Sequence, residues 1–248
     1  MIAQNSRLFW GPLFVRLFDL TLPMIRLVDV CKRYRIGNQQ RIILDHLNAD
    51  FVPGVNMGIL GRNGAGKSTL VRIIGGAIYP DSGYVERTSR ISWPIGFSGC
   101  FNNKLSGRAN LRFVCRIYGA DIHEVTEFVE DFSELGKYMD MPIKNYSSGM
   151  AAKLAFGLSM AIGFDYYLID EVSAVGDASF REKCNRVFEE RKKQATLIVV
   201  SHNIGTIKKH CNAAGVLNNG TLIFYRNVDD AIASYQEICS KPIEMRFA

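Results

Sequence analysis

The sequence predicts an α/β fold in which a parallel-sheet core is interrupted by a helical insert. Two short runs, Tyr166–Ile169 and Thr196–Val200, are almost wholly apolar, as expected of strands buried on both faces of a parallel sheet. A third apolar run, Asn56–Leu60, leads into glycines and then into a helical pattern from Lys67 to Ala77. Between these core segments, residues 108–163 carry apolar side chains at helix spacing.

The segments that flank the core predict antiparallel strands and further helices. Ile25–Val30 and Ile42–Phe51 have the pattern of an antiparallel pair. Near the end of the chain, Ala213–Leu217 and Thr221–Phe224 flank Asn218-Asn219-Gly220, which is a strong hairpin turn. Two more helices are expected over about Ala178–Lys193 and Asp229–Ile238.

Apolar side chains recur at helix spacing in four segments, and each set predicts the buried face of one helix. The first set follows the glycines of the core, and the other three lie in the insert. They are Leu70, Val71, Ile73 and Ile74; Leu111, Val114, Cys115 and Tyr118; Val125, Phe128, Val129 and Phe132; and Leu154, Ala155, Leu158 and Ala161.

The composition is that of a globular protein, with 248 residues, 48% hydrophobic and 22% charged. No stretch reaches the roughly 18 uninterrupted apolar residues of a membrane-spanning helix, so we expect the chain not to cross a membrane by itself. The net charge of +6 is spread along the whole chain. That spread favours a solvated surface, while attraction to nucleic acid or to an anionic membrane face remain the other interpretations. The six cysteines form no CxxC pair or zinc-type spacing, which favours buried thiols in a reducing compartment.

The first 23 residues differ from the rest of the chain. They are rich in Leu and Phe, but Gly11, Pro12, Arg16 and Asp19 interrupt the apolar run, and no cleavage site follows it. Met24 then opens a clean strand pattern. We expect translation to start at Met24, so that residues 1–23 are not native. A membrane-surface amphipathic segment and a disordered tail are the alternatives.

Residues 61–68 fit the phosphate-binding pattern G-x-x-x-x-G-K-[ST] between a predicted strand and a predicted helix. Glycines let backbone N–H groups cradle phosphates, and the helix N-terminus adds a positive dipole there. Lys67 is expected to reach the β- and γ-phosphates, and Ser68 to offer its hydroxyl to Mg²⁺. The predicted nucleotide-contacting residues are Gly61, Arg62, Asn63, Gly64, Ala65, Gly66, Lys67, Ser68 and Thr69.

Two later strands deliver polar residues at their carboxyl ends, where α/β sheets bind ligands. Asp170 follows a buried strand and is expected to hold Mg²⁺, while Glu171 is placed to polarise the attacking water. His202 follows the next strand and is expected to contact the γ-phosphate. By itself His202 could equally be a surface or capping residue, because Ser201–Asn203 could cap the next helix. Tyr146-Ser147-Ser148-Gly149-Met150 has the pattern of an N-cap, which also suits a second phosphate contact.

The order of these motifs resembles the nucleotide-binding domain of ABC transporters over about residues 24–240. This resemblance implies a P-loop NTPase (RecA-like) core with an antiparallel β subdomain, and one domain over residues 24–248 with its helical insert at about 95–163. It also implies that Ser147, Ser148 and Gly149 form the signature motif, with Ser148 and Met150 departing from Leu-Ser-Gly-Gly-Gln. Tyr34 falls where the family stacks an aromatic ring on adenine, and residues 172–177 match the D-loop. Asn102 takes the place of the Q-loop glutamine, as a shorter amide ligand for Mg²⁺ and water.

The finer motifs are similar to the ATPases of bacterial capsular polysaccharide export. They are Ile91-Ser92-Trp93-Pro94, Tyr146 to Met150, and Leu168 to Val172 followed by Ala174-Val175-Gly176-Asp177. The resemblance implies an ATP- and Mg²⁺-dependent homodimer at the cytoplasmic face of the bacterial inner membrane. It would bind two integral-membrane permease subunits through about residues 92–120, and the polysaccharide would contact mainly the permease, with no role for nucleic acid.

Other functions fit parts of the same pattern. Export of O-antigen, teichoic acid or another substrate uses related ATPases, although those for O-antigen and teichoic acid often carry a long C-terminal extension. A soluble ABC ATPase usually pairs two domains or inserts a coiled coil, and this chain has one P-loop and no sustained heptads. A P-loop kinase lacks the signature, and an inactive structural subunit is at odds with Glu171 and His202.

Overall fold

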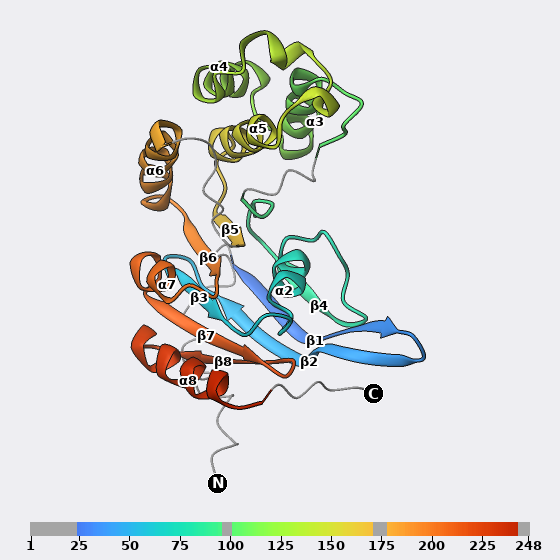
Figure 1. The fold of residues 1–248 in the computed structure, drawn as a ribbon, viewed down its shortest axis with the longest axis vertical. Coiled ribbons are helices and arrows are strands. Elements are labelled where there is room, and N and C mark those ends of the chain that lie inside the picture. The colour runs from blue at the N-terminus through green and yellow to red at the C-terminus, as the bar shows by residue number, and fades with distance from the viewer. Residues whose placement is uncertain (1–23, 96–100, 171–177, 243–248) are drawn as a thin grey trace. The chain divides into compact units, whose positions relative to one another are not determined.

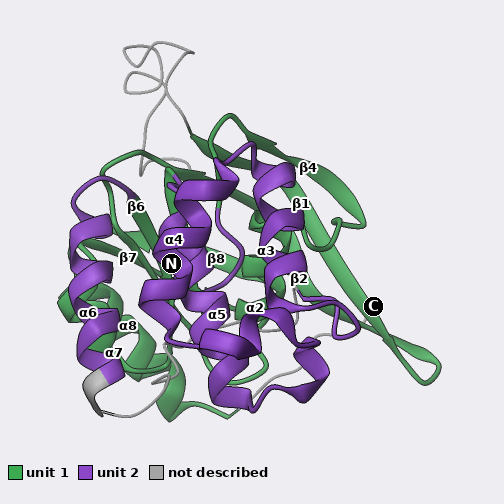
Figure 2. Cartoon of the chain, turned by 90° about the horizontal axis from the view of Figure 1, so that it is seen from above, with its two compact units in different colours: residues 1–91, 165–171, 196–248 green, residues 92–164, 172–195 purple. Residues whose placement is uncertain are grey.

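The computed structural model describes residues 24–95, 101–170 and 178–242. The chain divides into two compact units (Figure 2): unit 1 holds residues 1–91, 165–171 and 196–248, and unit 2 holds residues 92–164 and 172–195. The expectations for residues 1–23, Glu171 and the D-loop residues 172–177 lie outside the described residues. No helix within the described ranges combines the length and apolar character needed to cross a membrane.

Unit 1 contains an antiparallel sheet of three strands in the order β2-β1-β4. The two predicted strands are confirmed and are longer than expected, with β1 at Ile25–Ile36 and β2 at Gln39–Phe51. The third strand, β4 (Ser82–Arg87), was not predicted from the sequence. Its residues are mostly exposed and polar, so it forms through backbone pairing with β1 and leaves no hydrophobic periodicity.

The second sheet of unit 1 has five strands in the order β5-β6-β3-β7-β8 (Figure 1). The first four strands are mutually parallel, and β8 pairs antiparallel with β7 through the predicted hairpin. The predicted double burial is confirmed, since every residue of β6 and all but the last of β5 are buried. The strands are β3 (Met57–Leu60), β5 (Tyr166–Asp170), β6 (Thr196–Val200), β7 (Ala213–Asn218) and β8 (Thr221–Tyr225).

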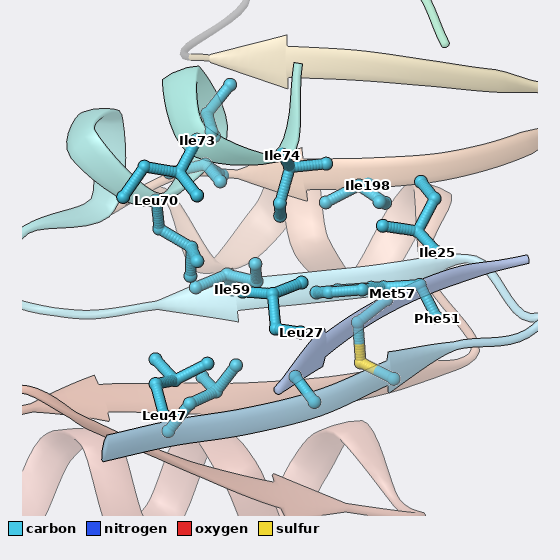
Figure 3. Close-up of a cluster of buried hydrophobic side chains, with 14 of the residues drawn as sticks. Ile25, Leu27, Leu47, Phe51, Met57, Ile59, Leu70, Ile73, Ile74 and Ile198 are labelled. Carbon is cyan, nitrogen blue, oxygen red and sulfur yellow. The ribbon is translucent and has the colours of Figure 1, made fainter. Parts of the chain in front are cut away.

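One hydrophobic cluster joins the two sheets of unit 1 to helix α2 (Lys67–Ile74), as Figure 3 shows. The predicted inward face of α2 is confirmed by the burial of all four residues, but the helix ends at Ile74 instead of Ala77. Ile25, Leu47 and Phe51 pack from the antiparallel sheet, and the Tyr166 hydroxyl donates to the carbonyl of Phe51 at 2.8 Å. Among its described residues, unit 1 also contains helices α7 (Ile204–His210) and α8 (Val228–Ser240).

Unit 2 is helical in its described part, as the spacing of apolar residues predicts. Its helices are α3 (Gly107–Tyr118), α4 (Ile122–Ser133), α5 (Ser148–Ala161) and α6 (Ala178–Lys192), with short 3₁₀ turns at Gly136–Asp140 and Ile143–Asn145. Phe132 of α4 lies at the centre, with ring centroids 5.6 Å from Phe156 and 5.2 Å from Phe180. Ser106, Asp121 and Ser147 cap the first three helices, as their side-chain types favour.

The cysteines follow the prediction only in part. Cys31, Cys115 and Cys184 are buried, but Cys211 is partly exposed and Cys239 is exposed on α8. The expectation of burial is therefore wrong for Cys239, because α8 is amphipathic and turns that residue towards solvent.

Candidate nucleotide-binding site

Three parallel strands bring the predicted site residues of unit 1 to one edge of the sheet. Asp170 at the end of β5 lies in register with Val200 of β6, and Val200 lies in register with Ile59 of β3. The residues that follow these strands therefore emerge side by side, with Ser201 and His202 between Asp170 and the loop after β3. Because neighbouring strands are about 4.8 Å apart, the ends of β5 and β3 are separated by roughly 10 Å.

The loop from Gly61 to Gly66 requires glycine for two separate reasons. Gly64 and Gly66 have φ values of 78° and 104°, a region that other residues rarely adopt. A Cβ atom on Gly61 would lie 2.7 Å from the carbonyl oxygen of Leu217, and one on Gly66 would lie 2.7 Å from Cγ2 of Ile43. The loop is therefore pressed closely against β2 and β7, and its shape is fixed by packing as well as by backbone freedom.

Lys67 places its ammonium group against the loop that precedes it. Its side chain is buried, and Nζ donates to the carbonyls of Gly61 at 2.7 Å and Arg62 at 3.0 Å. Gly66 occupies the N-cap of α2 without a side-chain acceptor, so no cap side chain occupies the first N–H groups of this helix. Ser68 is exposed at the same helix start. This arrangement of positive charge, dipole and N–H groups suits a phosphate chain.

Arg41 is a residue of this site that sequence reasoning missed. Its Nη2 donates to the carbonyl of Gly64 at 2.9 Å, and in the β1–β2 ladder it lies opposite Tyr34. Tyr34 is 42% exposed, and Nζ of Lys32 lies 5.7 Å from its ring centroid. Arg41 thus links the exposed aromatic residue to the phosphate-binding loop. No local signal marks it, because its partner is 23 residues away in the sequence.

Arg62 connects the loop to the end of α8, which the sequence also did not reveal. Its Nη1 donates to the carbonyl of Lys241 at 2.6 Å, in the region where the last carbonyls of a helix need partners. A pocket of about 390 Å³ lies beside this contact. It is lined by residues of β2, the loop, the β7–β8 turn and the α8 end: Arg41, Ile42, Ile43, Arg62, Asn63, Gly64, Ala65, Asn218, Asn219, Gly220, Ile238, Lys241 and Pro242.

His202 is exposed at the edge of the sheet and does not cap the following helix. The cap of α7 is Asn203, whose Oδ1 accepts from the N–H groups of Gly205 at 2.8 Å and Thr206 at 3.3 Å. Ser201 is buried, and its Oγ accepts from the N–H of Asn203 at 2.9 Å. The expected cap within Ser201–Asn203 is therefore confirmed at Asn203, and His202 is a surface residue that follows β6, next to Asp170 and the loop.

The predicted signature residues lie in unit 2 at the start of α5. Oγ of Ser147 accepts from the N–H of Met150 at 3.2 Å, which confirms the predicted N-cap. Ser148 is exposed, and Gly149 is partly exposed. A pocket of about 280 Å³ adjoins them, lined by Ser133, Glu134, Leu135, Tyr138, Ser147, Gly149, Met150 and Lys153.

Asn102 has a structural role that its sequence position did not reveal. Its Oδ1 accepts from the N–H of Lys104 at 3.0 Å, closing a tight turn of the Asx type. Its backbone bonds to the side chain of Asn110, which is buried in α3: the Asn102 N–H donates at 2.8 Å and the Asn102 carbonyl accepts at 3.1 Å. The shorter amide thus fits a turn that is tied to unit 2.

Comparison with known proteins agrees with this geometry. The model of the ABC transporter family matches residues 44–174. The polysialic acid transport ATP-binding protein KpsT of Escherichia coli is 50% identical over 217 residues, covering 86% of this chain and 99% of the relative. BexA, an ATP-binding protein of Haemophilus influenzae, is 48% identical over 86% of this chain and 99% of its own length. The capsule polysaccharide export ATP-binding protein CtrD of Neisseria meningitidis is 47% identical, over 87% and 100%.

Solved structures share the fold. The ATP-binding cassette MJ0796, in a dimeric post-hydrolysis state bound to ADP and phosphate, matches with a TM-score of 0.65 and 21% identity over 80% of this chain and 96% of that one. An ATP-binding subunit of an ABC transporter matches with a TM-score of 0.70 and 19% identity, over 88% and 100%. The predicted class, a P-loop NTPase core with an antiparallel β subdomain and helical insert, is thereby confirmed.

Proposed function

The chain belongs to the ABC transporter family, and we propose that its ATP hydrolysis drives export of capsular polysaccharide across a bacterial inner membrane. The observation that carries this proposal is the identity of 47–50% along almost the whole length of three relatives, two of them named for transport of polysialic acid or capsule polysaccharide. The loop geometry at Gly61–Lys67 supports the ATP-dependent step. The relative named for teichoic acid export is less similar, at 34% identity.

ATP would bind to unit 1 along a line from Tyr34 to Lys67. The exposed Tyr34 ring offers a stacking surface for adenine, and Arg41 holds the intervening loop by its bond to Gly64. The phosphates would lie against the loop residues Gly61, Arg62, Asn63, Gly64, Ala65 and Gly66, with Lys67, Ser68 and Thr69 at the start of α2.

Mg²⁺ fits the same edge of the sheet. The Ser68 hydroxyl at the start of α2 and the half-buried Asp170 carboxylate at the end of β5 are hard oxygen donors, which suits this ion. The amide of Asn102 is the third proposed donor. When bound, the ion neutralises charge on the phosphate oxygens.

Hydrolysis requires a base and a charge-stabilising contact. Glu171 follows Asp170 directly and is proposed to accept the proton of the attacking water. His202 is proposed to donate to the γ-phosphate, and its exposure between β5 and β3 supports that role. Lys67 stabilises the negative charge that develops on the same group.

A second copy of the chain completes the site in this proposal. Ser147, Ser148 and Gly149 at the start of α5 would contact the γ-phosphate held by the partner's loop. Two arguments support a head-to-tail homodimer: each chain carries the loop in unit 1 and the signature in unit 2, and a related cassette of the same fold is dimeric.

Two integral-membrane permease subunits are the proposed partners at the cytoplasmic face. The outer side of α3 carries Phe113 at 58% exposure and Ile117 at 61%, with Leu105 just before the helix at 43%. Such exposed apolar side chains favour a protein interface. They fall within the predicted contact region of residues 92–120, and the polysaccharide itself would pass through the permease.

The test is the location of polysaccharide in cells that lack the protein or that express Lys67→Ala. Polymer trapped inside the cell in both strains supports the proposal, because the variant keeps the chain but removes the phosphate-binding ammonium. Normal surface capsule with loss of another surface polymer, such as teichoic acid, would overturn the proposed substrate class.

A further inference from the structure

Three side chains with metal-binding atoms meet between β1 and β2, outside the residues that line the pocket beside the phosphate-binding loop. One donor atom each from Cys31, Asp45 and His46 lies within 4.8 Å of the other two. In a tetrahedral site with metal–ligand bonds of about 2.0–2.3 Å, donor atoms are roughly 3.5 Å apart. Small side-chain rotations therefore suffice to bring these atoms around one ion.

A β-bulge brings Cys31, Asp45 and His46 together. In the β1–β2 ladder Val30 pairs with Leu47 and Lys32 pairs with Leu44, so Cys31 alone lies opposite Asp45 and His46. Adjacent strand residues normally point to opposite faces. The bulge, with His46 at φ 49°, lets both side chains approach the same sulfur.

Strain in the backbone accompanies the bulge. His46 and Asp29 are two non-glycine residues with positive φ, at 49° and 53°, a conformation that costs free energy and is concentrated at functional sites. Asp29 lies in the neighbouring register shift of β1, and its N–H donates to the side chain of Asn48 at 3.0 Å. Its carboxylate Oδ1 is 2.7 Å from Nδ1 of His46.

These contacts are those that usually surround a metal site. A metal-binding imidazole normally donates its second ring N–H to a carboxylate, as the Asp29–His46 pair allows. With the proton on Nδ1, Nε2 carries the lone pair for a ligand. The backbone N–H of His46 donates to Sγ of Cys31 at 3.2 Å, which orients the sulfur.

We propose that Cys31, Asp45 and His46 form a binding site for one Zn²⁺ ion, oriented by Asp29. A sulfur, an imidazole nitrogen and a carboxylate oxygen together favour Zn²⁺ over Mg²⁺ or Ca²⁺, which prefer oxygen ligands. Water can supply the fourth ligand. The sequence spacing hides the site, because the bulge joins residues 31 and 45–46 from different strands.

The ion would join the two strands that lead to the nucleotide site. Cys31 lies on β1, the strand that also carries Tyr34, and Asp45 is tied to the β7–β8 turn because its N–H donates to the carbonyl of Gly220 at 2.9 Å. We therefore expect Zn²⁺ to raise the melting temperature of the protein, since a ligand that binds only the folded state stabilises it.

The test uses the full chain without a histidine tag, stripped with EDTA and titrated with Co²⁺ and then Zn²⁺. We expect one equivalent of Co²⁺ with a thiolate-to-metal charge-transfer band, displaced by Zn²⁺. Cys31→Ser should abolish the band, and His46→Asn, which tolerates positive φ, should weaken binding at least tenfold. Asp29→Asn should weaken binding roughly 10- to 100-fold, as loss of an orienting partner does.

Cys239→Ser is the matched control, because it removes an exposed cysteine on α8 and should leave the Co²⁺ spectrum unchanged. If Cys31→Ser does not fold, the spectrum of the unmodified protein still shows whether a thiolate binds Co²⁺. Co²⁺ binding without a thiolate band, or a band that survives in Cys31→Ser, would overturn the proposal.

Discussion

Replacing Gly66 by alanine perturbs the nucleotide site in two independent ways, through steric contact with Ile43 and through backbone strain. The new Cβ would lie 2.7 Å from Cγ2 and 3.2 Å from the carbonyl oxygen of Ile43, at a residue with φ 104°. Backbone strain of this kind costs about 1–3 kcal/mol, and inserting a methyl group into a packed contact costs about 1–3 kcal/mol more. The sum, about 2–6 kcal/mol, is below or comparable to the roughly 5–15 kcal/mol that keeps a domain folded.

The loop can relieve this strain by moving away from β2, which displaces the N–H groups at the start of α2. We therefore expect Gly66→Ala to remain folded but to bind ATP at least 30-fold more weakly, since each 1.4 kcal/mol is about a factor of ten. Binding is measured by titration calorimetry with Mg-ATP, and folding by circular dichroism and thermal unfolding.

Gly119→Ala is the matched control. Gly119 also has positive φ, at 61°, but a Cβ atom placed on it would meet no atom within 4 Å, and it caps α3 in unit 2. It should lose about 1–2 kcal/mol of stability from the left-handed conformation and retain ATP binding. If Gly66→Ala bound ATP with wild-type affinity, the argument that contact with Ile43 fixes the loop would be refuted.

Four further outcomes are expected. Arg41→Ala should weaken ATP binding about fivefold, because a half-exposed charged hydrogen bond contributes only ~1 kcal/mol; calorimetry checks this against Arg41→Lys. Tyr166→Phe should lower the free energy of unfolding by about 1–3 kcal/mol in denaturant titrations, since the hydroxyl bonded to the Phe51 carbonyl is lost in a buried position. Burial raises the pKa of Cys184 from 9.0 to about 11. Maleimide at pH 8 should therefore label Cys239 much faster than Cys184 by mass spectrometry. The Cys184 thiol ionises at a lower pH in the unfolded chain than in the folded protein. Its contribution to the free energy of unfolding should therefore be lost as pH rises from 9.0 to about 11.

The fold was predictable where burial leaves a periodic signal. The apolar runs of β5 and β6 and the helix spacing of α2 identify elements whose side chains face the core. β4 carries no such signal, because its mostly exposed residues are held by backbone pairing to β1. The end of α2 was placed too late, since two glycines at 75 and 76 stop the helix and the apolar spacing alone continues past them.

The site was predictable where chemistry is local in the sequence. The loop residues, Asp170 and His202 each stand in a short motif next to a strand. Arg41 and Arg62 were missed in their supporting roles, because their partners lie 23 and 179 residues away and depend on how β2 and α8 pack. Asn102 was found by its place in a motif, while its turn-forming bond to Lys104 appears only in the structure.

The two helix starts proposed to meet ATP differ in a way that suits their roles. α2 begins at Gly66, which has no side chain to occupy the first N–H groups, and Lys67 adds a buried positive charge. α5 begins after Ser147, whose hydroxyl already accepts from the N–H of Met150. This leaves the N–H groups of Ser148 and Gly149 to contact a ligand. The first helix start therefore has the capacity to hold several phosphates, and the second suits a single phosphate group presented by a partner. Such unequal capacities favour nucleotide binding first to unit 1, followed by closure of the dimer.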